Sequence, residues 1–142
     1  MTDLHSNSLT ITADASRLKE LRDWTRQQLM LCQYDENMIE SVVLAIGEAA
    51  MNVVQHSFGG GDTKGELSLE ITADGDDLIF RITDNAPVID PTTISSRNLE
   101  QVRPGGLGIH FINSLMDTVE YRPLPQQRGN LLIMKKRVSR AC

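Results

Sequence analysis

The sequence predicts an α+β fold with two layers, in which about three helices cover one face of a mixed, mostly antiparallel sheet. Five short segments show the patterns of strands, and three longer ones carry apolar residues at helical spacing. Four of the five strand-like segments form two consecutive pairs joined by short connections, which favours antiparallel pairing.

Length and composition fit one globular domain over residues 1–142. Of the 142 residues, 40% are hydrophobic, so the chain can build a core without the support of a disulfide or a metal. The two cysteines, Cys32 and Cys142, form no disulfide framework or metal-binding pattern. The first residues lack the basic and apolar regions of a signal peptide, and no apolar run approaches the length of a membrane span. We therefore expect a cytoplasmic protein without a membrane partner.

Acidic and basic residues are unevenly distributed. The net charge is −5, but residues 1–90 carry 16 acidic and 6 basic side chains, while residues 91–142 carry 3 and 8. The negative net charge argues against a direct nucleic-acid binder. The basic last third is compatible with an anionic ligand or a docking face, and equally with charges scattered over a solvated surface.

The first half of the chain predicts one strand and two helices. Residues 9–13 alternate between apolar and polar, as in a strand. Helical spacing follows over residues 16–32, with Ser16 as the expected N-cap, and again over about residues 36–57. The second helix carries a wide apolar stripe, which predicts that it packs against the sheet.

The second half begins with a hairpin and continues through an irregular segment. Residues 66–73 and 78–83 flank a turn rich in Asp and Gly, which is typical of a hairpin. Residues 85–105 hold three prolines and show no sustained period, so we expect a lid or binding loop over about residues 86–105. The remaining predicted elements are a third helix that follows Gly105–Gly108 and ends near Met116, and two strands over residues 117–123 and 130–138.

Glu48 and Asn52 form the first candidate site. They are four residues apart on the second helix and share a face, and Gln55 and His56 extend its polar edge. A carboxylate beside an amide oxygen suits a nucleotide bound with Mg²⁺, and the carboxylate can accept a proton from a hydroxyl group. The same spacing is also that of a solvated helix face, and His56 can serve only to stabilise the end of the helix.

Two further candidate sites follow later in the chain. Asp84 ends a predicted strand, where a partly buried carboxylate can accept a hydrogen bond from the exocyclic amine of adenine. Asp84 to Pro87 equally has the composition of a turn. The segment Gly105–Gly108 opens the third helix, where backbone N–H groups can bind phosphate, and Arg103 adds positive charge. That cluster also fits an ordinary entry into a helix, and it lacks the Lys-Ser/Thr of a P-loop.

In this order, the three sites resemble the Bergerat-type ATP site of the GHKL ATPase superfamily, and more narrowly the bacterial anti-sigma factor serine/threonine kinases. The resemblance covers about residues 9–138. Glu48–His56 resembles the N-box, including a histidine eight residues after the glutamate. Asp84–Pro91 resembles the first glycine box and Gly105–Ile109 the second. Gly129-Asn130 falls where the family has a glycine followed by a polar residue near the nucleotide.

The resemblance implies ATP and Mg²⁺ as cofactors, and it implies a role for each matched residue. Glu48 is expected to act as general base toward a Ser or Thr hydroxyl of a partner, Asn52 to coordinate Mg²⁺, and Asp84 to bind the adenine amino group. Gly106 and Gly108 are expected to let backbone amides surround the phosphates. The residues expected to bind the nucleotide are Asn52, His56, Asp84, Ala86, Arg103, Gly105, Gly106, Leu107, Gly108 and Asn130.

The resemblance also implies a function, that of an ATP-dependent protein serine/threonine kinase acting as an anti-sigma factor. Such proteins sequester a sigma factor and phosphorylate a small antagonist protein, which then releases them, and they often form homodimers. One departure keeps other functions open: the family usually has glycine where this chain has Ala86, whose methyl group lies where backbone would approach adenine. The alternatives are a non-catalytic sequestering module with a degenerate nucleotide site, and the ATP-binding part of a split two-component kinase.

Overall fold

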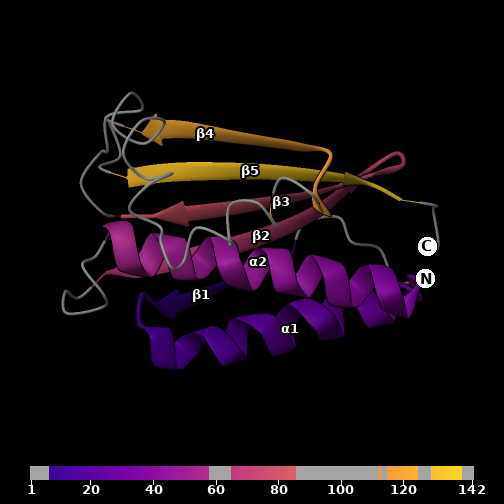
Figure 1. The fold of residues 1–142 in the computed structure, drawn as a ribbon, viewed down its shortest axis with the longest axis horizontal. Coiled ribbons are helices and arrows are strands. Elements are labelled where there is room, and N and C mark those ends of the chain that lie inside the picture. Colours follow the sequence, from indigo (N-terminus) through magenta and orange to yellow (C-terminus); the bar gives the residue numbers. More distant parts are fainter. Residues whose placement is uncertain (1–6, 58–64, 86–111, 113–114, 125–128, 139–142) are drawn as a thin grey trace.

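A computed structural model of the chain describes residues 7–57, 65–85, 112, 115–124 and 129–138 (Figure 1). Within these ranges the chain forms a five-stranded sheet and two long helices. Ile112 and Leu115 are also helical, and the Met116 amide donates to the Ile112 carbonyl oxygen at 3.0 Å. The elements in chain order are β1 (Asn7–Thr12), the 3-10 helix η1 (Ala15–Arg17), α1 (Leu18–Leu31), α2 (Glu36–Ser57), β2 (Glu66–Asp74), β3 (Asp77–Asp84), β4 (Thr118–Leu124) and β5 (Gly129–Arg137).

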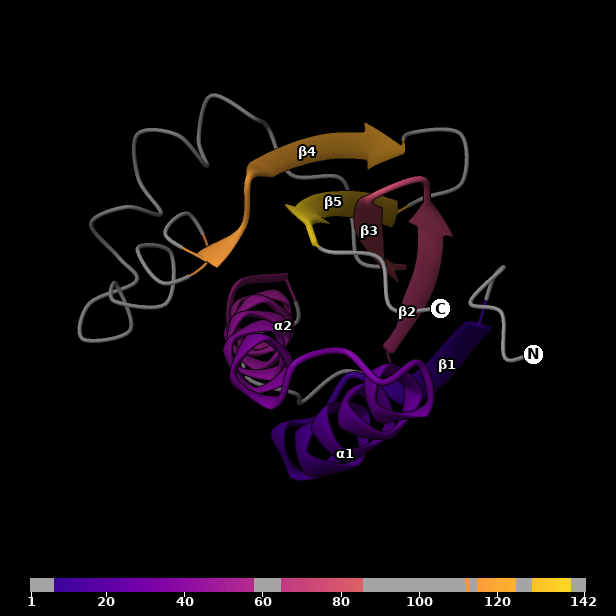
Figure 2. The same cartoon turned by 90° about the vertical axis from the view of Figure 1, so that its right-hand side faces the viewer.

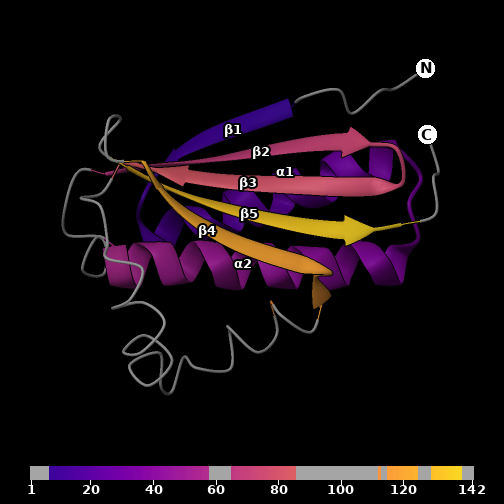
Figure 3. The ribbon, with the colours of Figure 1, turned by 90° about the horizontal axis from the view of Figure 1, so that it is seen from above.

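The strand order is β1-β2-β3-β5-β4, and every neighbouring pair in this sheet is antiparallel (Figure 3). β3 is therefore the central strand, with β2 on one side and β5 on the other. In the sheet β5 lies between β3 and β4, although β4 precedes β5 in the sequence. In this register Asp84, at the end of β3, lies opposite Leu67 of β2 and Asn130 of β5.

Both helices pack on the same face of the sheet and give the domain its two layers (Figure 2). Residues two apart on a strand point to the same face, so Leu67, Leu69 and Ile71 of β2 all face the helices and are fully buried. Phe80 of β3 is fully buried among them. The helices contribute Leu18, Leu21, Leu29, Ile39, Val42, Ile46, Ala49, Ala50 and Val54 to this core.

The helices α1 and α2 form an antiparallel hairpin that is held together in part by side chains of α1 lying against α2. Arg26 of α1 donates from Nε to Glu40 Oε2 of α2 at 2.8 Å. Further along the pair, a Cβ atom added at Gly47 would lie 2.9 Å from Cδ of Arg22. The glycine therefore allows the Arg22 side chain to lie directly against the α2 backbone.

The helix α2 is the one helix in the described ranges that is long and apolar enough to cross a membrane, with a mean hydropathy of 1.3 within Glu36–Gln55. Half of that stretch is buried inside the domain. Packing against the sheet accounts for its apolar character, because a core helix needs a wide apolar stripe.

The predicted two-layer α+β fold is confirmed, with differences at the ends of elements. The five strands and the first two helices occur where the sequence predicts them. The prediction that Ser16 caps α1 is wrong, because η1 precedes that helix and Asp14 caps η1 by accepting from the Ser16 amide at 2.9 Å. The expected lid over residues 86–105 lies outside the described ranges, as does most of the third helix.

Candidate functional site

The candidate site begins where the central strand β3 ends. Because side chains alternate between faces, Asp84 shares the helix-covered face with Leu78, Phe80 and Ile82. Asp84 is only 6% exposed. A carboxylate in this position needs hydrogen-bond partners, since removing it from water without them costs several kcal/mol.

Asn130 provides such a partner from the neighbouring strand. The register of β3 and β5 places it opposite Asp84, and its Nδ2 donates to Asp84 Oδ1 at 2.9 Å. Asn130 is 1% exposed, and its Oδ1 accepts a hydrogen bond from the hydroxyl group of Tyr121 on β4. Three adjacent strands thus contribute one connected set of polar groups, which runs from Tyr121 through Asn130 to Asp84.

Gly129 allows β5 to approach the end of β3. A Cβ atom at this position would lie 2.1 Å from the carbonyl oxygen of Asp84, far inside any real contact distance. The obstacle is backbone, so it cannot rotate away. The absence of a side chain at Gly129 is therefore a condition for the register in which Asn130 meets Asp84.

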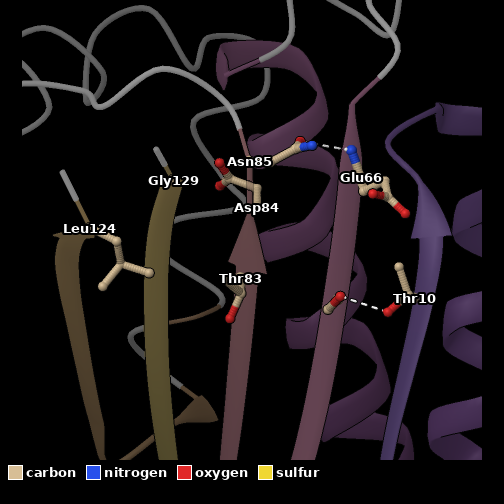
Figure 4. A pocket seen from close by; sticks show the side chains of 8 residues that line it. Thr10, Glu66, Thr83, Asp84, Asn85, Leu124 and Gly129 are labelled. Carbon is tan, nitrogen blue, oxygen red and sulfur yellow. Dashed lines mark hydrogen bonds between the residues drawn. The ribbon is translucent and has the colours of Figure 1, made fainter. Parts of the chain in front are cut away.

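Asn85 closes the edge of the sheet directly after Asp84. Its side-chain Oδ1 accepts a hydrogen bond from the Glu66 amide at 2.8 Å (Figure 4). The Asn85 side chain thereby replaces a backbone carbonyl as the partner of the first residue of β2. This hydrogen bond holds the ends of β2 and β3 together at the base of the candidate site.

The polar face of α2 lies toward the same end of the molecule. α2 and β3 run in the same direction, so their C-terminal ends are at the same end of the domain (Figures 1 and 3). Glu48 and Asn52 lie one turn apart in the C-terminal half of α2, and both are half-buried, whereas Ala49 and Ala50 are buried in the core. Glu48 and Asn52 are therefore at the border between core and solvent.

A pocket of about 340 Å³ opens at the same strand ends but on the other face of the sheet (Figure 4). Alternation places Thr10, Ser68 and Thr83 on the face opposite Phe80, and Thr10 Oγ1 lies 2.7 Å from Ser68 Oγ. The pocket shares Asp84 with the predicted site, whereas Glu48 and Asn52 of α2 lie on the helix side of the sheet and do not line it (Figure 3). The other residues that line the pocket are Glu66, Asp84, Asn85, Leu124 and Gly129.

The structure brings some of the predicted site residues together. Asp84 and Asn130 are in direct contact, and Glu48 and Asn52 share one face of α2. Sequence reasoning missed Tyr121, because its part in the site depends on the pairing of β4 with β5. The following predictions lie outside the described part of the chain: Ala86, Arg103, Gly105, Gly106, Leu107, Gly108 and the side chain of His56.

Comparison with known proteins identifies the family. The sequence model of the histidine kinase-like ATPase domain matches residues 11–136. The serine-protein kinase RsbW of Halalkalibacterium halodurans is 33% identical over 115 residues, which cover 75% of this chain and 66% of that protein. RsbW of Listeria monocytogenes serotype 4a is 33% identical over 109 residues, covering 71% and 67%. This chain thus matches about two thirds of the length of these relatives.

Solved structures share the fold. The RsbU and RsbW domains of Rv1364c from Mycobacterium tuberculosis superpose with a TM-score of 0.63 at 21% identity, covering 94% of this chain and 33% of that one. The catalytic domain of histidine kinase ThkA superposes with a TM-score of 0.56 at 9% identity, covering 93% and 96%. At such low sequence identities, the structural similarity shows a shared fold and nothing more. The match to the family's sequence model, by contrast, covers residues 11–136 of this chain. The chain belongs to the histidine kinase-like ATPase domain family.

Proposed function

We propose that this chain is an ATP-dependent protein serine/threonine kinase that acts as an anti-sigma factor in a partner-switching pathway. Relatives named serine-protein kinase support the reaction, and the ATPase domain family supports ATP as phosphate donor. The observation that carries the proposal is the buried hydrogen bond between Asp84 and Asn130. It holds a carboxylate at the end of the central strand, at the end of the domain to which α2 brings Glu48 and Asn52.

Asp84 is the proposed adenine-binding residue. An ionised carboxylate only accepts hydrogen bonds, and the exocyclic amine of adenine is a donor. A carboxylate has about four acceptor positions, so accepting from Asn130 is compatible with accepting from a base. A carboxylate at the end of β3 therefore suits the amine edge of an adenine base.

Asn52 and Glu48 are the proposed residues for phosphate chemistry. An amide oxygen such as that of Asn52 suits Mg²⁺, which takes few protein ligands besides phosphate oxygens and water. ATP, when bound, supplies the phosphoryl group, whose transfer depends mainly on positioning and charge neutralisation. Glu48 accepts the proton of the attacking Ser or Thr hydroxyl as the oxygen bonds to phosphorus and ADP leaves.

The remaining parts of the proposal concern organisation and partners. We propose one domain over residues 1–142, with a lid over about residues 86–105 that contributes Arg103 and the Gly105–Gly108 segment to the nucleotide site. The proposed protein partners are a small anti-sigma antagonist, which is the Ser/Thr substrate, a sigma factor and a second copy of this chain. The proposed location is the cytoplasm.

Transfer of labelled phosphate from ATP to the cognate antagonist tests the kinase assignment. We expect label on a Ser or Thr of the antagonist, and we expect Glu48→Ala to abolish transfer while leaving ATP binding intact. Glu36→Ala, which removes an exposed acid from the first turn of the same helix, is the matched control and should retain transfer.

Three other results are possible, and each would contradict a different part of the proposal. Transfer that survives in Glu48→Ala would rule out Glu48 as the general base. A protein that binds its antagonist without transferring phosphate would be a sequestering module, the alternative that the departure at Ala86 keeps open. Label on a histidine would indicate part of a two-component kinase.

A further inference from the structure

We infer that Tyr121 is a positioning residue for base recognition, which acts through Asn130 on the orientation of the Asp84 carboxylate and thereby raises the preference for adenine over guanine nucleotides. This inference rests on the proposed role of Asp84 in binding adenine. It assigns a function to a residue of β4 that is two strands away from β3 in the sheet.

The chemistry of the three side chains fixes the direction of their hydrogen bonds. Asn130 donates from Nδ2 to Asp84 Oδ1, so the carboxylate is the acceptor in this pair. The amide oxygen then points the other way, and the Tyr121 hydroxyl must donate to it. Rotation of the amide by half a turn would bring its oxygen against the carboxylate, where two acceptors repel. Tyr121 and Asp84 therefore hold the Asn130 amide from both ends.

The position of Tyr121 favours a positioning role over a direct one. On β4 it pairs with Leu132, and Pro123 is the residue opposite Asn130, so the Tyr121 hydroxyl reaches Asn130 along the diagonal of the strand pair. Tyr121 and Asn130 lie on the helix-covered face, as Asp84 does. Asn130 is 1% exposed, and it accepts from the Tyr121 hydroxyl at Oδ1 while donating to the Asp84 carboxylate from Nδ2, so it connects the two groups.

Adenine and guanine differ in the group that Asp84 would meet. Adenine presents an amine donor at position 6, whereas guanine presents a carbonyl acceptor at the same place. A carboxylate held in one orientation attracts the first and repels the second. Loosening the carboxylate weakens the contact with adenine and gives no corresponding loss for guanine, so the ratio of the two affinities should fall.

Tyr121→Phe removes the hydroxyl group and keeps the ring, so it tests this role with little change in packing. Binding of ATP and of GTP, each with Mg²⁺, is measured by calorimetry for the wild type and the variant. We expect ATP affinity to fall by about three- to tenfold, the effect of one lost hydrogen bond, with GTP affinity unchanged. The matched control is Tyr34→Phe, because Tyr34 is buried before the start of α2, about 30 Å along that helix from its C-terminal end. This control should leave both affinities unchanged.

A second comparison separates positioning from a general effect on stability. In the Asn130→Ala background, Tyr121→Phe should no longer change ATP affinity, because the connection to Asp84 is already lost. An effect of the same size in both backgrounds would overturn the inference, as would equal losses for ATP and GTP or no loss for ATP. If the wild type fails to bind ATP at all, the proposed function itself is wrong. If the wild type binds ATP and Tyr121→Phe binds it equally well, only the inference about Tyr121 is wrong.

Discussion

Replacing Gly129 with alanine tests the close approach of β5 to β3, on which the site depends. The added Cβ atom would lie 2.1 Å from the Asp84 carbonyl oxygen, and real Cβ contacts essentially never fall under 3.0 Å. The two strands must therefore separate by about 0.9 Å at this point. Forced shifts of this kind lower the free energy of unfolding by about 1–3 kcal/mol. For a domain of this length, the melting temperature should fall by roughly 3–10 °C.

Thermal and urea denaturation measure this effect, and Gly47→Ala is the matched control. At Gly47 the obstructing atom belongs to the flexible Arg22 side chain, which can move aside. Alanine is also preferred over glycine inside a helix by about 1 kcal/mol. We therefore expect Gly47→Ala to be as stable as the wild type or more stable. A Gly129→Ala protein with wild-type stability would refute the close approach and the register derived from it.

Three further predictions concern the sheet edge, the core and a surface ion pair. Asn85→Ala removes the acceptor of the Glu66 amide, so unfolding should become easier by about 0.5–1.5 kcal/mol and hydrogen exchange at that amide faster. Asn85→Asp keeps an oxygen acceptor, and exchange as fast as in Asn85→Ala would contradict this reasoning. Phe80→Ala should lower the free energy of unfolding in urea by about 3–5 kcal/mol, since Phe80 is fully buried; a loss below about 1 kcal/mol would contradict its place in the core. The hydrogen bond from Arg26 holds the pKa of Glu40 below its ordinary value of 4.5. That pair stabilises the fold above this value and loses its effect as the pH falls through the lower folded-state pKa. Glu40→Gln should be slightly less stable than the wild type at neutral pH and equally stable in strong acid, and a deficit independent of pH would exclude the ion pair as its cause.

The elements of the fold were predictable because their patterns are local. The strands β2 and β3 follow from alternation in residues 66–73 and 78–83, and α2 follows from apolar residues at helical spacing. The start of α1 was harder to predict. Asp14 and Ser16 both suit a cap, and only the backbone shows that Asp14 caps a short 3-10 turn ahead of the helix.

Strand order and register were not predictable in this way. Two consecutive hairpins leave open which of the last two strands pairs with β3, and the insertion of β5 between β3 and β4 is a contact between distant parts of the chain. A shift of the register by one residue would turn Asn130 to the other face of the sheet. Local sequence patterns therefore could not predict which side chains contact one another across the sheet.

The candidate site was also predictable only in part: the sequence indicated several of its residues but not the contacts between them. Asp84 and Asn130 were both expected near a nucleotide, but they are 46 residues apart, and only the sheet shows that they form a hydrogen bond. The family resemblance matched Gly129, but the physical reason for a glycine at this position is evident only from the Asp84 carbonyl oxygen beside it. Tyr121 resembles any aromatic residue in a strand until its hydroxyl group is placed against Asn130.

Binding of ATP with Mg²⁺, measured by calorimetry, tests the central claim most directly. The wild type is compared with Asp84→Ala and with Asp77→Ala, which removes a carboxylate from the other end of β3. We predict that the wild type and Asp77→Ala bind ATP alike and that Asp84→Ala loses binding by at least about tenfold, the loss expected for a hydrogen bond to a charged group. Equal binding by Asp84→Ala, or no binding by the wild type at millimolar ATP, would contradict a nucleotide site at the end of β3.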